Sequence, residues 1–348
     1  MSFLNKRFIF KKNKNYQIII LSKDLRLKNF DNINISFEII NIYYLFAAIK
    51  YFLFKNKDNQ NLKSIYLKIF ISSFKPKIII GNNVDLKIFK IKKIFPNITC
   101  ICYQFGYVTD KTAKKLYKNN KFFCDYFLAF HKDDIKILKK NIISKFIVAG
   151  SIKNNSIPKK NDKKKYICFI SEYKKIYSNN TRFQKIKYIK FIVNCIAEFC
   201  KKNKYKLLIA LRSNRIDKNM SHVDEIKFYK SFLKDDFSTN FNKNSYKVGE
   251  KCFVSIGIHS NLCYELLARG EKVFFINLNK NLYPPMYNIR KKKLIFFEKK
   301  NKKQIFIKIK KIIKLNDNNW KKYSNKISKI HFDPKNIELN NLIRKSIN

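Results

Sequence analysis

The chain has 348 residues, 46% of them hydrophobic and 16% aromatic, which allows a large buried core and argues against wholesale disorder. Its formal net charge is +52, but the basic residues are nearly all Lys and are spread along the whole chain, together with other residues that share A/T-rich codons. We interpret the charge as mostly compositional, which disfavours a specific nucleic-acid site but still allows attraction to an anionic membrane surface.

The pattern of cysteines and the N-terminal residues help to predict the cellular compartment of the protein. None of the eight Cys forms a C-x-x-C pair, and most lie in apolar segments, as buried reduced thiols do. Residues 1–15 lack the apolar segment of a signal peptide, and no run of 18 apolar residues occurs. We expect a cytoplasmic protein, with peripheral contact to the inner face of the cytoplasmic membrane as an open option.

The first half of the chain is predicted to alternate between strands and helices. Residues 16–21 read as a first strand. Residues 39–54 are the most apolar segment, which we interpret as a core helix, with a membrane-contacting helix as the alternative. Further strands are predicted at 77–80, 98–103, 126–130 and 146–149. Ligands of an open parallel sheet bind beyond the carboxyl ends of its strands. The polar residues at such ends are Asn83, Gln104, His131 and Ser151.

A polar, Pro-containing and Lys-rich stretch, NNSIPKKNDKKK, separates the two halves. The second half alternates in the same way, with strands predicted at 166–170, 206–211 and 252–256. Two such halves predict an α/β protein with two Rossmann-like domains that face each other across a cleft. The predicted parts are an N-terminal domain at 1–155, a linker at 156–165, a C-terminal domain at 166–330 and a tail at 331–348.

Residues 252–277 read as strand, tight loop, short helix, Gly stop and second strand. Ser260 or Asn261 can cap the helix, whose N-terminus offers N–H groups and a partial positive charge to an anion. Glu265, one turn further on, has the wrong spacing for a capping box. An ordinary βαβ unit with a solvated Glu is one interpretation. The other is a nucleotide-diphosphate site, with phosphate at Ser260 and Asn261 and a ribose hydroxyl on Glu265.

Other polar residues follow the strands of the second half and one strand of the first. Arg212, next to Ser213, can form a bidentate contact with phosphate, although a surface ion pair is an alternative, and Ser171 can add a hydroxyl. His259 lies inside the anion loop and can donate to a phosphate or act on the leaving group, with a loop residue that contributes only shape as the alternative. His131 is a candidate base near the acceptor, with plain helix capping as its alternative.

Several reaction classes lack their motifs. The G-x-S-x-G, Walker, G-x-G-x-x-G and zinc patterns are absent. The adjacent carboxylates Asp133-Asp134 and Asp235-Asp236 would point apart on a helix, so they make poor metal clamps. We therefore expect no metal site and no cofactor.

The stretch GIHSNLCYELLARGEKVFFIN resembles the small-S-T-L-G-Y-E-x-L-A-R-G-K-K-V segment of bacterial surface-carbohydrate proteins. These form the O-antigen or lipopolysaccharide biosynthesis family, which has a GT-B-like fold. Further matches are PKIIIGNNVD, YQFG, CDYFLAFHKD, KFIVAGSIKNN, CFISEYK and ALRS. The resemblance implies a C-terminal domain that holds an activated-sugar donor and an N-terminal domain on the acceptor side.

Residue by residue, the resemblance also implies functional positions. These are Gln104, Gly106, Ser151, Asn155, Ser171, Arg212, Ser260 and Glu265. With Asn83, the first four form the predicted acceptor side. The chain departs from the family where Asn261 replaces Thr, Cys263 replaces Gly and Phe105 replaces Asn. Cys263 crowds the approach of a ligand to the backbone, and Phe105 puts one acceptor contact in doubt.

Together these features predict a glycosyltransferase-like enzyme of surface polysaccharide biosynthesis. It would transfer a sugar from a nucleotide-activated donor to a lipid-linked or glycan acceptor, and the helix N-terminus with Arg212 would stabilise the leaving diphosphate without metal. The alternatives are a nucleotide-sugar epimerase of the same fold, a polyol-phosphate transferase, and a non-enzymatic basic protein that binds RNA or anionic lipid.

Overall fold

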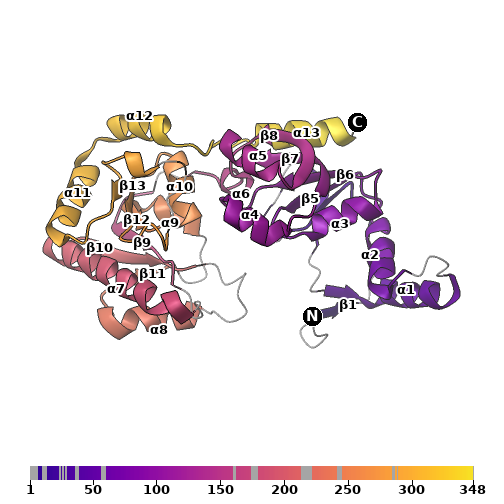
Figure 1. Cartoon of the computed structure of the whole chain (residues 1–348), viewed down its shortest axis with the longest axis horizontal. Coiled ribbons are helices and arrows are strands. Elements are labelled where there is room, and N and C mark those ends of the chain that lie inside the picture. Colours follow the sequence, from indigo (N-terminus) through magenta and orange to yellow (C-terminus); the bar gives the residue numbers. More distant parts are fainter. Residues whose placement is uncertain are drawn as a thin grey trace. The chain divides into compact units, whose positions relative to one another are not determined.

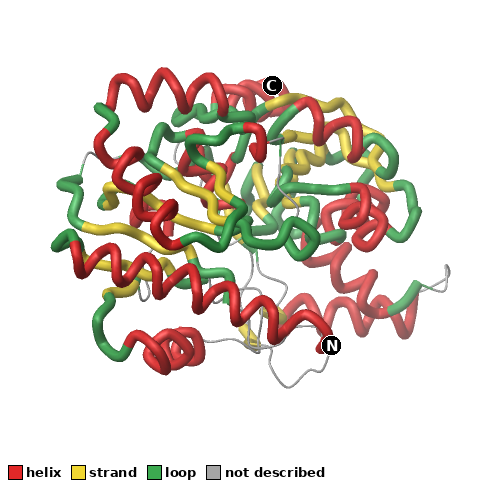
Figure 2. The backbone as a smooth tube through the Cα atoms, turned by 60° about the vertical axis from the view of Figure 1, so that its left-hand side comes forward, coloured by secondary structure: helices red, strands yellow, loops and turns green. Residues whose placement is uncertain are grey.

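The computed structural model divides the chain into two compact units, Met1–Ser156 with Asp333–Asn348, and Ile157–Phe332. It describes all residues except 1–6, 10–13, 23–24, 26, 28–29, 36–38, 56–59, 160–161, 174–178, 213–221, 241–244, 284–286, 288 and 348. Each unit contains a parallel sheet with helices around it (Figures 1 and 2). This confirms the predicted α/β class with two Rossmann-like domains.

The sheet of the first unit has the strand order β3-β2-β5-β6-β7-β8. Its strands are β2 (Ile18–Ile20), β3 (Asn32–Asn34), β5 (Ile78–Asn82), β6 (Thr99–Tyr103), β7 (Phe122–Ala129) and β8 (Ile142–Val148). A separate parallel pair consists of β1 (Arg7–Ile9) and β4 (Ile39–Asn41). The helices are α1 (Ile42–Lys55), α2 (Leu62–Ser72), α3 (Lys87–Ile94), α4 (Asp110–Tyr117), α5 (Lys132–Leu138), α6 (Ile152–Asn155) and α13 (Ile337–Ile347).

The apolar strands of this sheet are buried on both faces. Successive side chains of a strand point to opposite faces, and β5 follows that rule. Ile78 and Ile80 pack into a cluster with Leu339 of α13, whereas Ile79 packs into a second cluster with Ile88 of α3. Residues 331–348, expected as a tail, therefore include a helix that belongs to the core of the first unit.

The expectation of a core helix over residues 39–54 is wrong. Residues 39–41 form β4, and α1 buries only Tyr44 and Ala48 among its 14 residues. Helix α1 packs mainly against α2 and the β1–β4 pair rather than against the six-stranded sheet. Hydrophobicity along the sequence marks such a helix as apolar but does not say how many of its sides are covered.

The sheet of the second unit has the strand order β11-β10-β9-β12-β13-β14, and it is also parallel. Its strands are β9 (Tyr166–Ile170), β10 (Lys206–Ala210), β11 (Ser238–Thr239), β12 (Cys252–Gly257), β13 (Val273–Ile276) and β14 (Phe296–Phe297). The helices are α7 (Asn179–Lys202), α8 (His222–Leu233), α9 (Ser245–Gly249), α10 (Asn261–Ala268), the 3-10 helix η2 (Ile289–Lys291), α11 (Lys302–Lys314) and α12 (Asp317–Ile327).

Arg269, at the C-terminus of α10, contacts both ends of the second unit. Its Nη1 donates to the carbonyl oxygen of Ile157 at 3.0 Å, and its guanidinium lies 4.9 Å from the ring centroid of Phe332. Its Nη2 lies 2.5 Å from Oε1 of Glu250, and both side chains are almost fully buried. A buried charge needs such a partner, because removing one member of the pair leaves the other desolvated.

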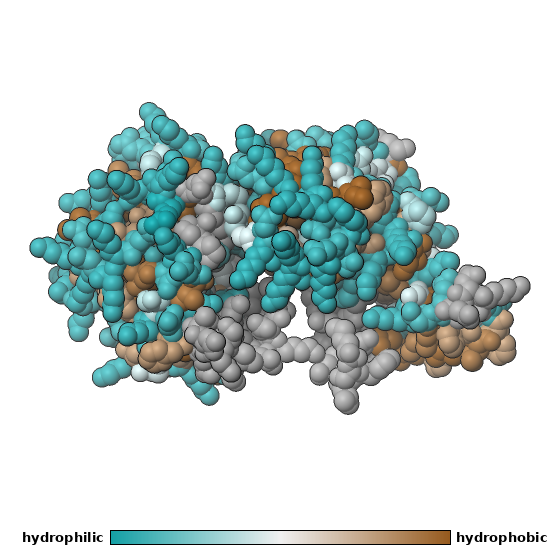
Figure 3. Space-filling model, in the orientation of Figure 1, coloured by the Kyte–Doolittle hydropathy of each residue, from teal (hydrophilic) through white to brown (hydrophobic). Residues whose placement is uncertain are grey.

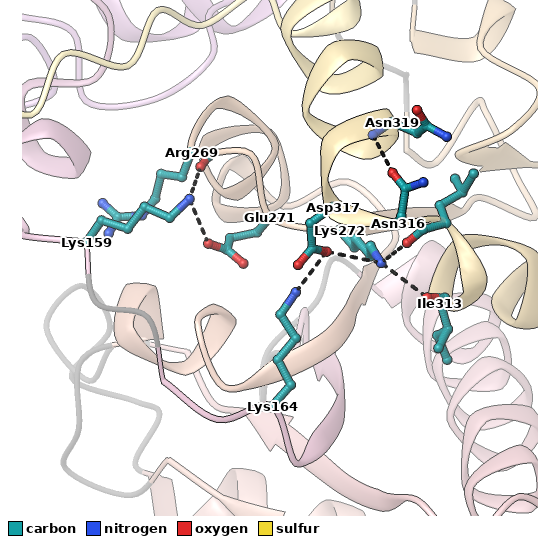
Figure 4. A network of polar contacts seen from close by, with 10 residues as sticks. Lys159, Lys164, Arg269, Glu271, Lys272, Ile313, Asn316, Asp317 and Asn319 are labelled. Atoms are coloured by element: carbon teal, nitrogen blue, oxygen red, sulfur yellow. Dashed lines mark hydrogen bonds and ion pairs between the residues drawn. The ribbon is translucent and has the colours of Figure 1, made fainter.

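The residues expected to form a linker, 156–165, are attached to the second unit by lysine contacts (Figure 4). Lys159 Nζ lies 3.4 Å from a carboxylate oxygen of Glu271 at the start of β13. Lys164 Nζ lies 3.6 Å from a carboxylate oxygen of Asp317 at the N-terminus of α12. This segment therefore packs against the second unit where the structure describes it.

Candidate anion-binding site

The centre of the second sheet is a point where the chain changes winding direction. Strand β9 comes first and lies between β10 and β12; β10 and β11 extend the sheet on one side, and β12, β13 and β14 extend it on the other. Ligands of open α/β sheets bind beyond the carboxyl ends of the strands at such a point. The residues that follow β9, β10 and β12 are therefore the first candidates for a site.

The loop after β12 leads directly into α10. Ser260 is the N-cap residue, with extended backbone angles (φ −65°, ψ 136°), and its side chain makes no capping hydrogen bond. His259, Ser260 and Asn261 are all partly exposed. The prediction that a helix begins at this loop is confirmed. The Ser260 hydroxyl, however, does not cap the helix.

A carboxylate from the neighbouring strand end reaches this loop. Glu172, two residues after β9, accepts a hydrogen bond from the backbone N–H of His259 through its Oε1. Burial raises the pKa of the Glu172 carboxyl, while the N–H groups of residues 258–260 and the charge of Arg212 act in the opposite direction. The N–H groups predicted to bind an anion thus face an internal anion, which we did not predict from the sequence.

Arg212, at the end of β10, is held by the first turn of α8. Its backbone N–H donates to Oε2 of Glu225 at 3.0 Å, and its carbonyl oxygen lies 2.6 Å from Nε2 of His222. Arg212 is partly exposed, and its loop is fixed through its backbone. Ser213, predicted beside it, lies outside the described residues.

Glu225 is fully buried beneath Arg212 and Ser171. Burial raises the pKa of its carboxyl to about 7, and this rise is opposed by hydrogen bonding with Ser171 and the Arg212 N–H and by the Arg212 charge. The Ser171 hydroxyl is itself buried and lies 2.7 Å from the hydroxyl of Tyr229. Ser171 is therefore bonded within the fold, and Glu225 links the two predicted phosphate-binding residues.

Glu265, the predicted ribose ligand, is 3% exposed. Its Oε2 accepts a hydrogen bond from the hydroxyl of Tyr246 in α9 at 2.9 Å. The sequence position of Glu265 does not predict this partner, because α9 precedes β12 in the sequence and contacts α10 only in the folded unit. Tyr246 thus joins Glu172 and Glu225 as site residues that sequence reasoning missed.

Cys263, predicted as a departure from the family pattern, is fully buried against the end of β12. A Cβ atom added to Gly257 would lie 2.3 Å from the Cys263 sulfur. Burial raises the pKa of the Cys263 thiol, and the nearby Glu172 carboxylate adds to the rise. The thiol therefore fills space next to Gly257 inside the unit.

A cavity of about 310 Å³ opens beyond the carboxyl end of β13. It lies on the same edge of the sheet as the loop before α10, because β13 pairs with β12. Arg290 Nε and Glu298 Oε1 form a 2.6 Å ion pair in its wall. The lining residues are Asn277, Leu278, Asn279, Lys280, Asn281, Arg290 and Glu298.

Two predicted acceptor-side residues join neighbouring loops of the first unit. Oδ1 of Asn83 accepts from the N–H of Phe105 at 2.9 Å, and Oε1 of Gln104 accepts from the N–H of Phe130 at 2.8 Å. Gln104 also donates to the carbonyl oxygen of Gly106 at 3.0 Å. Asn83 and Gln104 are buried, so their amides shape the loops at the carboxyl edge of the sheet.

The remaining predicted residues of the first unit end or begin short helices. Ser151 caps α6, and His131 caps α5 by accepting the Asp133 N–H at its Nδ1 over 3.1 Å. Oδ1 of Asn155 accepts from the N–H of Asp333 at 3.1 Å, which fixes the returning chain before α13. The capping alternative for His131 matches this geometry. Among the described residues of the whole chain, no three His, Cys, Asp or Glu side chains gather as a metal site.

A family described as "putative O-antigen biosynthesis protein" matches residues 104–347, well over half of the chain. The chain belongs to this O-antigen biosynthesis family. The match includes the whole second unit and the strand ends of the first unit from Gln104 onward. No curated protein matches the chain in sequence. In the part of the chain that the structure describes, no helix combines the length and apolar character needed to cross a membrane.

Solved structures with a similar fold include an epimerase and a polymerase. UDP-GlcNAc 2-epimerase from Neisseria meningitidis, bound to UDP-GlcNAc, has 12% identity and a TM-score of 0.54, over 96% of this chain and 99% of that one. The wall teichoic acid polymerase TagF, soaked with CDPG, has 11% identity and a TM-score of 0.51, over 97% and 89%. At this identity the likeness establishes the fold, which agrees with the predicted GT-B-like type.

Proposed function

We propose that this O-antigen biosynthesis protein is a GT-B-type glycosyltransferase. It would move a sugar from a nucleotide-activated donor to a lipid-linked or glycan acceptor at the inner membrane face. The observation that carries the proposal is the pairing of Glu172 with the N–H of His259 at the N-terminus of α10. A loop that holds a carboxylate has the donors and the charge to hold a phosphate.

In this proposal the donor diphosphate takes the place of the Glu172 carboxylate. The N–H groups before α10 and the guanidinium of Arg212 then face the phosphates and stabilise the charge that develops on the leaving diphosphate. Such stabilisation needs no metal ion. Ser171 and Glu225 act beneath the site by fixing the loop that carries Arg212.

We assign the donor ribose to Glu265, with Tyr246 holding its carboxylate in place. Glu265→Gln keeps an oxygen that can accept from Tyr246 and removes the charge that strengthens a hydrogen bond from a hydroxyl. We expect roughly tenfold weaker UDP binding in Glu265→Gln. The variant should also lose discrimination between UDP and 2′-deoxy-UDP, as measured by calorimetric titration. Equal preference for UDP in both proteins would exclude the ribose assignment.

His131 is the proposed base on the acceptor side, and the partly exposed ring at the start of α5 is compatible with that role. His131→Asn is the informative variant, because Asn retains the N-cap but cannot act as a base near neutral pH. Unchanged turnover in this variant would restrict His131 to capping.

A nucleotide-sugar epimerase is the second candidate, because the N. meningitidis structure of the same fold is an epimerase bound to UDP-GlcNAc. A polyol-phosphate transferase is the third, since TagF is a polymerase of wall teichoic acid. The deciding experiment is a panel of UDP-, CDP- and GDP-sugars. Thermal stabilisation identifies the donor, and product analysis without any acceptor separates the enzymes, since only an epimerase changes the sugar under those conditions.

Failure of every nucleotide in the panel to stabilise the protein would overturn the donor site. Binding of RNA that weakens steeply with salt would then favour the basic binding protein.

A further inference from the structure

Helix α1 carries an apolar surface that the first unit leaves uncovered. Its buried side, with Tyr44 and Ala48, faces α2, where the Tyr44 and Phe70 rings lie 5.9 Å apart. The exposed fractions of Phe46, Leu53 and Phe54 are 63%, 66% and 78%. The space-filling view shows this surface as a brown patch in the region of α1 (Figure 3).

Most of the exposed apolar side chains of α1 lie on one side of the helix, while Tyr51 and Phe52, also exposed, point to other sides. Positions 43, 46, 50, 53 and 54 recur at intervals of three, four, three and one residues, which places them along one side of a helix. All five are exposed, and four of them are aromatic or aliphatic. We call this set the α1 face. Scattered apolar residues are normal on a protein surface, whereas a contiguous face of this kind marks an interaction site.

The charges around the α1 face favour a lipid partner. Helices α1 and α2 contain Lys50, Lys55, Lys63 and Lys68, all exposed, and no Asp or Glu. Lys50 lies within the face, and Lys55 lies at its C-terminal end. A face of Phe, Tyr and Leu on a helix pair whose only charged residues are Lys is the pattern of helices that lie in the interface of an anionic bilayer.

The length of α1 determines how it could meet a bilayer. A helix needs about 20 apolar residues to span the hydrocarbon core, and α1 has 14. A helix of that length can instead lie parallel to the surface, with its apolar side among the acyl chains and its lysines at the headgroups.

We propose that the α1 face binds an anionic lipid bilayer. The proposal deepens the peripheral membrane association proposed above, but its residues all lie in the first unit, apart from the donor site. It would bring the unit to which we assign the acceptor side to the surface that carries a lipid-linked acceptor.

The test is co-sedimentation of the full chain with vesicles of phosphatidylcholine alone and of equimolar phosphatidylcholine and phosphatidylglycerol. We expect strong binding to the mixed vesicles only. The variant Phe46→Ser/Leu53→Ser/Phe54→Ser should lose roughly tenfold or more of this binding, because it keeps every lysine but removes the apolar contact. The matched control is Phe183→Ser/Ile307→Ser in the second unit, where the exposed fractions are 76% and 48%; it should bind like wild type.

A second measurement follows insertion directly. The native Trp320 is 1% exposed and lies in the second unit, so quenching by brominated lipid should not affect it. Fluorescence of Phe54→Trp should gain a component that brominated lipid quenches. Equal vesicle binding by the triple variant, or a dimer that forms through the α1 face without vesicle binding, would overturn the proposal. Thermal shifts with the nucleotide panel, unchanged in the triple variant, keep this outcome separate from the donor site.

Discussion

Glu172 is an internal anion at the position that we assign to a phosphate. Its carboxylate accepts the N–H of His259 and lies near the charge of Arg212. A bound diphosphate and this carboxylate would compete for the same donors, so the free protein is stabilised at the expense of ligand affinity. In the proposed mechanism the donor diphosphate must therefore displace the Glu172 carboxylate in order to bind.

Removing the Glu172 carboxylate should strengthen the binding of a diphosphate. We expect Glu172→Ala to bind pyrophosphate and UDP about tenfold or more tightly, since one hydrogen bond to a charged group corresponds to roughly 1.5–3 kcal/mol. Calorimetric titration measures the change. Glu198→Ala is the matched control, because Glu198 is also an ion-paired carboxylate of the second unit and its removal changes the net charge equally. Weaker binding by Glu172→Ala would instead make Glu172 a ligand of the donor.

Sequence reasoning located one part of this site and missed another. Arg212 and Ser260 follow strands, and polar residues after parallel strands predict a binding edge without knowledge of the strand order. The role of Glu172 depends on β9 lying between β10 and β12, which is a property of the folded sheet. Glu225 likewise differs from the solvated glutamates of the chain in being buried, and helix periodicity alone did not predict its burial.

At the scale of elements, the contact between β12 and α10 shapes the loop before α10. Gly257 ends β12, and the sulfur of Cys263, one turn into α10, occupies the space where a Gly257 side chain would lie. A residue without a Cβ at 257 leaves room for the Cys263 sulfur. The two positions should therefore be energetically coupled.

Gly257→Ala should destabilise the second unit by about 1–3 kcal/mol, the usual cost of overpacking a filled core. In the Cys263→Gly background the same substitution should cost clearly less, because the sulfur that it meets is gone. Urea denaturation of the four proteins forms a double-mutant cycle. Additive costs would show that the strain arises elsewhere, for example at Ile170, the next neighbour of the added Cβ.

The elements themselves were predicted with uneven success, for physical reasons. The central strands of both sheets are short apolar runs bounded by polar turns, and such runs identify buried strands. For α1 the same hydrophobicity was misread as burial, because composition does not specify how many neighbours a helix has. Helix α13 was missed because its partner, the sheet of the first unit, is distant in sequence.

For the whole molecule, stability depends on pH through carboxyls buried in the second unit. The pKa of Glu225 is raised from its ordinary value of 4.5 to about 7 by burial. Between these values the folded unit keeps a proton that the unfolded chain has lost. The free energy of unfolding contributed by this group therefore falls as pH rises from about 4.5 to 7. Arg212 is the cationic neighbour: its backbone N–H donates to Glu225, and its charge opposes the rise in pKa.

Glu225→Gln should remove this dependence, because the amide is neutral at every pH and retains an acceptor for the Arg212 N–H. Relative to the variant, wild type should lose on the order of 3 kcal/mol between pH 4.5 and pH 8, at about 1.4 kcal/mol per unit of pKa shift. Chemical denaturation of both proteins at several pH values, followed by near-UV circular dichroism, measures the difference. Glu172 and Glu271, whose pKa values burial also raises, titrate in both proteins and cancel in the comparison. Parallel pH profiles for the two proteins would mean that the folded unit ionises Glu225 as readily as the unfolded chain does.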